Sequence, residues 1–492
     1  MNKLIYRVLF FVLIMSNLNN GNAQHKIDIS IPSFAGDTLI FGNYFRKSLM
    51  IKDSAILDQN GRGIFKGKEN LPDGLYAIFL SNKKWIDIII DKNQFFSISV
   101  DTSDLIRKTV IKNDPENKRF FEYQKYLMDK RELATFIENR IKNPISVSDS
   151  ILAKTELDSL NKEVLEYIDV TTNNNPSSFL STLLVSLREV EVPDPSRDKN
   201  GLIDSTFQYR YYKSHYFDNF DLSDVRLLRT PYYEKHLIFY LDKLIIPYPD
   251  SIYKEVDWLV EKARADTFLF QYMLTTLFNY YAERMNKFVG MDAIYVYIAE
   301  KYYIPEAHWS NPKFLTELSD RIKKLKPLLI GKDAPDIQLV KIPDDHFKLA
   351  ATDTLALKNP YVGDFFNLRN IDAKFILLYF WESDCGHCKK SIPELFRIYN
   401  TLKDKGVQIV AVHMLTGVEG KVKWVDFINN EKLYGWINAW NPYDFSYREI
   451  YDITSSNILY LIDENKKILA KKLSPEQAEK IILEELKRKT KL

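Results

Sequence analysis

The sequence predicts a multidomain chain with a small N-terminal β-sandwich, a central α-helical domain and a C-terminal α/β domain. At 492 residues the chain is too long for one ordinary domain. Its apolar residues alternate with a period of two near the N-terminus, take a helical period from about residue 116, and change pattern again near residue 323. Hydrophobic residues make up 46% and charged residues 27%, which is typical of globular proteins.

Residues 1–23 are predicted to be a signal peptide. Lys3 and Arg7 precede a short apolar run, and Gly21-Asn22-Ala23 then places small residues before a cleavage point at Gln24. The apolar run is too short to span a bilayer, and no second long apolar stretch follows it. We therefore expect an exported, periplasmic protein, with an uncleaved membrane anchor as the alternative.

Residues 24–112 carry the pattern of short β-strands. Three isoleucines alternate with polar residues from Ile27 onward, and Asn60-Gly61 is a strong signal for a two-residue hairpin. Pro72-Asp73-Gly74 predicts another turn, followed by apolar strand segments at 75–80 and 85–90. Short strands separated by such turns predict a β-sandwich of about 80 residues.

Residues 113–326 are predicted to be helical. Phe120, Tyr123 and Leu127 fall on one face of a helix, and Asn175-Pro176-Ser177 is a plausible helix start. Further helical patterns cover residues 157–168, 179–187, 232–243, 252–265, 268–286 and 291–303. No fixed-period repeat is found.

Residues 327–492 are predicted to form an α/β domain. The continuous apolar run at 375–381 is typical of a strand that is buried on both faces of a sheet. The elements expected after it are a helix from Cys388, a strand at 407–412, a helix at 422–430, strands at 458–462 and 467–470, and a closing helix at 475–487.

Charge and cysteine content narrow the function. Basic and acidic residues nearly cancel, 68 against 66, so no overall field favours nucleic acid. The chain has only two cysteines, Cys385 and Cys388, which are separated by two residues. Closing so small a loop removes little entropy from the unfolded chain, so this pair would be a poor structural disulfide. Its spacing suits redox chemistry instead.

The cysteine pair lies where a buried strand meets a helix. Unsatisfied N–H groups and the helix dipole stabilise a thiolate at that position, which favours Cys385 as the attacking sulfur. Cys388, one turn later, is within reach to resolve a mixed disulfide. Gly386 and His387 separate the two, and a protonated His387 would further stabilise the thiolate. The alternatives are an inert disulfide and half of a metal site, but no second cysteine pair or histidine cluster completes four ligands, so we expect no metal and no cofactor.

The C-terminal part resembles the exported TlpA-like branch of the thioredoxin superfamily over about residues 328–492. The matching residues are Gly331 to Asp336 and the run from Phe380 to Pro393, in which Pro393 matches the proline that kinks the active-site helix. The resemblance implies a thioredoxin-like fold and disulfide exchange with protein substrates. The helical segment, notably at 210–212 and 226–231, is similar to a domain of unknown function that accompanies such domains, and the β segment is more loosely similar to another.

Two positions depart from the family. A cis-proline usually precedes the third core strand, and here Asn457 takes its place, so we expect a trans or strained loop facing the substrate. Thioredoxins also bury an aspartate six residues before the first cysteine, where this chain has Tyr379. Proton transfer to or from Cys388 would need another group, and Glu382 is the nearest acidic candidate on the strand side that could tune the redox pair, with an exposed strand-end carboxylate as the alternative. Trp381 is assigned to the substrate-facing surface or, alternatively, to core packing.

Three functions from different classes remain open. The first is a thiol–disulfide oxidoreductase that acts on protein thiols and disulfides, with a membrane redox donor or acceptor as a further partner. The second is a partner-binding envelope protein in which the α/β domain is largely structural. The third is a peroxide-consuming thiol enzyme, which would require a lone peroxidatic cysteine in a different context.

Overall fold

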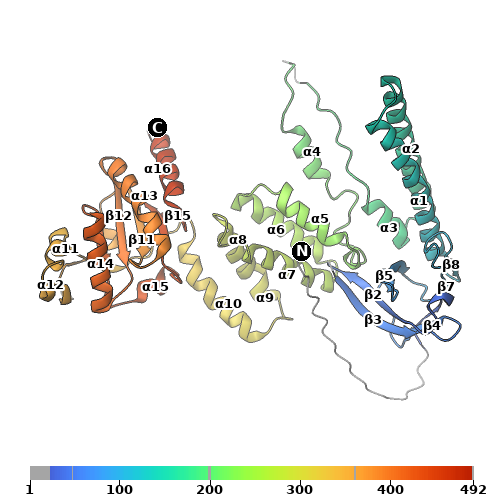
Figure 1. Cartoon of the computed structure of the whole chain (residues 1–492), viewed down its shortest axis with the longest axis horizontal. Helices are drawn as coiled ribbons and strands as arrows, with labels where there is room; N and C mark the ends of the chain where they lie inside the picture. The colour runs from blue at the N-terminus through green and yellow to red at the C-terminus, as the bar shows by residue number, and fades with distance from the viewer. Residues whose placement is uncertain (1–22, 47, 198–200, 360–361, 490–492) are drawn as a thin grey trace. The chain divides into compact units, whose positions relative to one another are not determined.

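The structure is a computed structural model that describes residues 23–489 except 47, 198–200 and 360–361 (Figure 1). The predicted signal peptide, apart from its last residue, lies outside the described residues. The chain divides into two compact units, Met1–Leu244 and Ile245–Leu492, so both units contain part of the predicted helical region. Among the described residues, no helix is both long and apolar enough to cross a membrane.

The N-terminal strands form two four-stranded sheets, with orders β4-β1-β7-β8 and β3-β2-β5-β6. Apolar side chains from both sheets pack together, and Phe41 stacks on Phe65 and Tyr76 with ring centroids 5.0 and 5.1 Å apart. The predicted β-sandwich is thereby confirmed. Its strands are β1 (His25–Ser30), β2 (Thr38–Phe45), β3 (Ser48–Ile56), β4 (Arg62–Gly67), β5 (Gly74–Phe79), β6 (Trp85–Ile90), β7 (Phe95–Ser99) and β8 (Val110–Lys112).

The predicted hairpin at Asn60-Gly61 is a tight turn, but the strands on its two sides belong to different sheets. Gly61 has a φ of 70°, and its N–H donates to the carbonyl of Asp58 over 2.9 Å. Strand β3 pairs with β2, whereas β4 pairs with β1, so the turn carries the chain from one layer to the other. A two-residue turn signal fixes local geometry but not the strand partners, which is why the hairpin prediction was wrong.

Helices α1 (Pro115–Lys142), α2 (Val147–Asn174), α3 (Phe179–Ser186), α4 (Phe207–His215) and α5 (Tyr233–Phe239) complete the first unit. Asp114 caps α1 by accepting from the N–H groups of Glu116 and Asn117. The Asn117 side chain then bonds both main-chain groups of Ile89 over 2.8 and 2.7 Å, which attaches α1 to the edge of β6.

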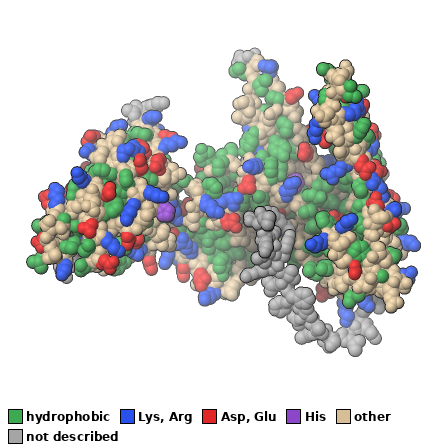
Figure 2. All heavy atoms as spheres, in the orientation of Figure 1, with side chains coloured by type: hydrophobic (Ala, Val, Ile, Leu, Met, Phe, Trp, Pro, Cys, Tyr) green, Lys and Arg blue, Asp and Glu red, His purple; other side chains and the backbone are tan. Residues whose placement is uncertain are grey.

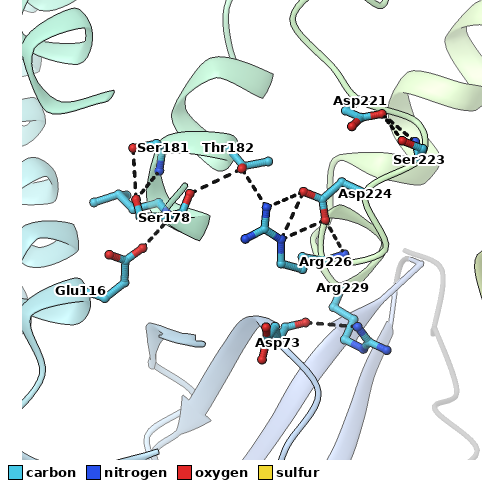
Figure 3. Close-up of polar contacts among 11 residues, drawn as sticks. Asp73, Glu116, Ser178, Ser181, Thr182, Asp221, Ser223, Asp224, Arg226 and Arg229 are labelled. Atoms are coloured by element: carbon cyan, nitrogen blue, oxygen red, sulfur yellow. Dashed lines mark hydrogen bonds and ion pairs between the residues drawn. The ribbon is translucent and has the colours of Figure 1, made fainter. Parts of the chain in front are cut away.

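The segment at 226–231, singled out in the sequence, joins these helices to the sandwich (Figure 3). Arg226 pairs with Asp224 and donates to the hydroxyl of Thr182 on α3 over 3.0 Å. Arg229 donates to the carbonyl of Asp73, in the turn before β5, over 3.1 Å. The two arginines therefore have a structural role in the first unit.

The second unit begins with helices α6 (Pro249–Ala263), α7 (Thr267–Ala282), α8 (Met291–Ile298), α9 (Ile304–Glu306) and α10 (Pro312–Leu325). These helices are tied to the α/β domain by ion pairs that are buried or partly buried. Arg321 on α10 forms a two-pronged ion pair with Asp452, and Lys471 pairs with the buried Asp292 on α8.

The α/β domain is built on a seven-stranded sheet with order β10-β9-β13-β12-β11-β14-β15. Its strands are β9 (Gln338–Lys341), β10 (Asp364–Asn367), β11 (Phe375–Trp381), β12 (Val407–His413), β13 (Ile437–Trp440), β14 (Ile458–Asp463) and β15 (Ile468–Lys471). Strand β11 runs parallel to β12 and antiparallel to β14, and all seven of its residues are buried, as its continuous apolar run predicts.

Helices cover both faces of this sheet. Side chains of α11 (Asp344–Ala350), α13 (Gly386–Leu402), α14 (Gly417–Glu431) and α16 (Pro475–Lys489) pack into one core. Helix α15 (Ser446–Ile450) packs into a second core on the opposite face, and the short α12 (Thr354–Lys358) lies beside α11 and α14. The predicted strand and helix order is confirmed, while β9, β10, β13, α11, α12 and α15 were not predicted.

Surface charge is mixed. Figure 2 shows basic and acidic side chains interspersed over the visible face of both units, without a large area of one sign. This distribution agrees with the near balance of charges in the sequence.

Candidate active site

Cys385 follows β11 and is the N-cap residue of α13. Its Sγ accepts a hydrogen bond from the N–H of Cys388 over 3.3 Å, as expected of a side chain that caps a helix. Cys385 is partly exposed, whereas Cys388, one turn further on, is fully buried, and both are free thiols. The geometry distinguishes one accessible sulfur from one that is protected.

The two thiols have opposite pKa shifts. Burial acts to raise the pKa of Cys385, but hydrogen bonds from Cys388, Ser456 and the main chain of α13 outweigh it, so the pKa is lowered. Burial raises the pKa of Cys388 to about 11, and its hydrogen bond to Cys385 adds to the increase. Cys385 is therefore the sulfur that ionises first.

The loop before β14 closes the site from the other side. The N–H of Asn457 donates to the carbonyl of Phe380 over 2.9 Å, and Ser456 contacts Cys385. Asn457 has a φ of 69°, in the left-handed region that asparagine tolerates better than most residues, and no cis peptide bond occurs among the described residues. The expected trans, strained backbone is found at this position.

Tyr379 is a site residue that the sequence interpretation missed. Its hydroxyl donates to Oδ1 of Asn457 over 2.8 Å. The same hydroxyl can instead donate to Cys388, which acts to lower the pKa of that thiol. Burial, and then the negative charge of a Cys388 thiolate, raise the pKa of Tyr379 itself far above its usual range. The sequence showed only that Tyr379 stands where related proteins have an aspartate.

A buried histidine supports the turn that leads to Cys385. Nε2 of His413, at the end of β12, accepts from the N–H and hydroxyl of Ser383 over 3.3 and 3.1 Å. Its Nδ1 lies 3.1 Å from the carbonyl of Leu415, and its ring stacks on Trp424. These contacts require a neutral imidazole, and the sequence predicted only a structural or solvated histidine here.

Trp381 does not face a substrate. Its side chain is fully buried and packs against His413 and Phe427, so the substrate-facing assignment was wrong and the core-packing alternative holds. The large apolar ring ends the continuously buried β11, which accounts for its position. Of the two residues predicted to face the substrate, Trp381 and Asn457, only Asn457 lies on the loop beside the thiols.

The other predicted site residues lie around the cysteine pair. Gly386 and His387 are exposed in the first turn of α13, and Pro393 lies inside that helix, where it cannot bond the carbonyl four residues earlier. Glu382 contributes main-chain groups: its carbonyl accepts from the N–H of Cys385 over 3.2 Å, and a backbone hydrogen bond lowers the pKa of Cys388.

A polar cleft of about 300 Å³ opens beside the thiols. It is lined by Glu382, Met414, Arg448 and the loop at 453–456, which includes the Ser456 that contacts Cys385. Within the part of the chain that the structure describes, no group of three or more His, Cys, Asp or Glu side chains could hold a metal ion.

The sheet, the active-site helix and the cysteine pair define a thioredoxin-like domain. Three family models match the chain: residues 330–471 match the AhpC/TSA family, residues 171–314 match the domain of unknown function DUF5106, and residues 25–120 match the domain of unknown function DUF4369. The predicted resemblance to a thioredoxin-like domain with two accessory domains of unknown function is confirmed.

The relatives are thiol–disulfide oxidoreductases. Thiol-disulfide oxidoreductase ResA of Halalkalibacterium halodurans is 33% identical over 51 residues, which cover 10% of this chain and 29% of that protein. ResA of Oceanobacillus iheyensis is 31% identical over 85 residues, 17% of this chain and 36% of that protein. The chain thus spans only about a third of the length of these curated relatives.

Solved structures include a domain of a possible thiol-disulfide isomerase from Cytophaga hutchinsonii. The two are 29% identical, and the match covers 34% of this chain and 99% of that domain, with a TM-score of 0.27. The family match and the curated relatives together show that the C-terminal part of the chain is similar to thiol–disulfide oxidoreductases.

Proposed function

We propose that this protein is a periplasmic thiol–disulfide oxidoreductase that exchanges disulfides with protein substrates through Cys385 and Cys388. One observation carries the proposal: an accessible thiol with a lowered pKa caps a helix, and a buried thiol with a raised pKa lies one turn away. The thiolate is the nucleophile in disulfide exchange, so this asymmetry assigns attack to Cys385 and resolution to Cys388.

The reaction proceeds in two exchange steps. The Cys385 thiolate attacks one sulfur of a substrate disulfide, forms a mixed disulfide and releases the other substrate sulfur as a thiolate. Cys388 then loses its proton and attacks Cys385, which forms the Cys385–Cys388 disulfide and releases the second substrate thiolate. Two electrons pass from the protein to the substrate, and the reverse sequence oxidises a substrate dithiol.

Reduction of insulin disulfides tests the chemistry. The wild-type protein, supplied with dithiothreitol, is expected to accelerate insulin precipitation, and Cys385→Ser is expected to abolish the acceleration. Cys388→Ala should accumulate mixed disulfides with envelope proteins that dithiothreitol releases. The matched control is Cys385→Ser/Cys388→Ala, which should trap none. Equal insulin reduction by wild type and Cys385→Ser would contradict the assignment.

A partner-binding envelope protein with a largely structural α/β domain is the second candidate. Residues 25–120 and 171–314 match domains of unknown function, and they make up a large share of the chain. A pure binding protein would reduce no insulin even as the wild type, and its envelope partners would still be recovered with Cys385→Ser. The insulin assay therefore separates the two candidates.

Export rests on the predicted signal peptide at residues 1–23. We expect the mature protein to begin at Gln24 and to be recovered from the periplasmic fraction, where a membrane redox donor or acceptor would set the direction of electron flow. N-terminal sequencing of the fractionated protein checks this. A cytosolic protein that retains Met1 would refute export.

A further inference from the structure

The two positions at which the sequence departs from its family meet in space. Tyr379, on the central strand β11, and Asn457, before β14, are 78 residues apart in the chain, and the tyrosine hydroxyl donates to Oδ1 of the asparagine over 2.8 Å. The main chain of Asn457 is held to the same strand, since its N–H donates to the carbonyl of Phe380. The loop is thus fastened to β11 by one main-chain and one side-chain bond.

The same hydroxyl lies at the resolving cysteine. Tyr379 and Cys388 are both almost fully buried in one core cluster. A hydrogen bond from Ser391, one turn after Cys388 on α13, acts to lower the pKa of Tyr379, so the phenolic oxygen accepts from one side. Its single hydrogen is left to be donated either to Asn457 or to the sulfur of Cys388.

The tyrosine is suited to donate a hydrogen and not to remove a proton. Burial and the neighbouring sulfurs keep the pKa of Tyr379 far above the working range, so the hydroxyl stays protonated. The titratable groups that face Cys388 are Cys385 on α13 and Tyr379 on β11. The loop side contributes Ser456 and Asn457, neither of which titrates.

We propose that Tyr379, held by Asn457, is the positioning residue for the resolving step, and that its hydroxyl turns to donate to the Cys388 thiolate as that thiolate forms. This rests on the proposed function and deepens it. In the mixed disulfide, Cys388 gives its proton to water and attacks Cys385. The Cys388–Cys385 bond forms, the Cys385–substrate bond breaks, and the electron pair leaves with the substrate sulfur. Tyr379 loses no proton in this step.

Rapid mixing of the reduced full-length protein with dithiobis(nitrobenzoate) separates the two steps. Attack by Cys385 releases one coloured thiolate in a first phase, and attack by Cys388 releases the second. Tyr379→Phe is expected to leave the first phase within about twofold and to slow the second about tenfold, the size expected for one hydrogen bond to a charged group. The pH at which the second phase accelerates should also move upward.

Two further variants separate positioning from general damage. Asn457→Gly keeps the left-handed backbone available but removes the carboxamide that holds Tyr379, so it should slow the second phase less than Tyr379→Phe does. Because both changes act on one hydroxyl, the double variant should be no slower than Tyr379→Phe alone. Tyr460→Phe removes another buried hydroxyl, which bonds the carbonyl of Tyr451, and serves as the control for loss of a tyrosine hydroxyl.

The outcomes distinguish this inference from the function itself. Absence of the first phase in the wild type would refute the oxidoreductase assignment. A normal first phase with an unchanged second phase in Tyr379→Phe would overturn the role of Tyr379 alone. Equal slowing of both phases, additive effects in the double variant, or an equal loss in Tyr460→Phe would show a merely structural role and would also overturn it.

Discussion

Replacing His413 by glutamine is predicted to make the α/β domain more resistant to acid. Burial lowers the pKa of His413 to about 3, because the charged imidazolium would lie in the core. Protonation would also turn Nε2 into a donor facing the N–H of Ser383, which now donates to it. An unfolded chain, by contrast, takes up a proton near pH 6.5.

The size of the effect follows from this difference in proton binding. Between about pH 6.5 and pH 3 the unfolded state holds one more proton at His413 than the folded state, so the free energy of unfolding falls by about 1.4 kcal/mol per pH unit. Lowering the pH from about 6.5 to about 5 therefore reduces the free energy of unfolding of the wild type by about 2 kcal/mol. His413→Gln keeps an acceptor oxygen for Ser383 and removes this titration.

Urea unfolding followed by tryptophan fluorescence, at about pH 7, 6 and 5, measures the slope. The signal reports mainly on the α/β domain, which holds four of the seven tryptophans: Trp381, Trp424, Trp436 and Trp440. Burial also lowers the pKa of His346, so both proteins retain that smaller contribution. The reasoning is refuted if wild type and His413→Gln lose stability equally between pH 7 and about pH 5.

Three shorter predictions test other parts of the second unit. Because the pKa of Cys385 is lowered and Cys388 is buried, iodoacetamide at neutral pH should modify Cys385 alone, as mass spectrometry would show; equal labelling of both would contradict the asymmetry. Arg321→Gln removes the partner of Asp452, whose side chain is 9% exposed, and should lower the free energy of unfolding by about 1–3 kcal/mol, with Arg321→Lys losing less. Lys432 has a φ of 53° at the end of α14, so its replacement by glycine should raise the free energy of unfolding by about 1 kcal/mol. An unchanged or lower urea midpoint would count against this.

Elements with a strong local pattern could be predicted from the sequence. The run at 375–381 contains no polar side-chain group except the tyrosine hydroxyl and the indole N–H of Trp381, and the strand it predicted is buried along its whole length. Strand β13 has no such pattern, because it includes Asn438. That side chain is buried and accepts from the indole N–H of Trp436 and donates to the carbonyl of Leu433, so a polar residue stands inside a buried strand and interrupts the apolar pattern.

The same limit applies to the site. Cys385 and Cys388 could be singled out as candidates because their spacing and the helix after them are local features. The role of Tyr379 could not be assigned, since its partner Asn457 comes from a distant loop. Each residue looked like a separate departure from the family, and only the folded sheet showed that the two are bonded to each other.

The contacts between the helices at 245–326 and the α/β domain decide where a redox-active fragment should begin. A protein cut at residue 327 would lose Arg321 and Asp292, and would leave Asp452 and Lys471 without the opposite charges they have in the whole unit. Asp452 begins the loop that ends at Asn457. Loss of α10 would therefore change the loop that lies beside the thiols. A fragment that starts at residue 245 keeps both ion pairs. It is therefore the fragment, shorter than the whole chain, that suits a redox assay.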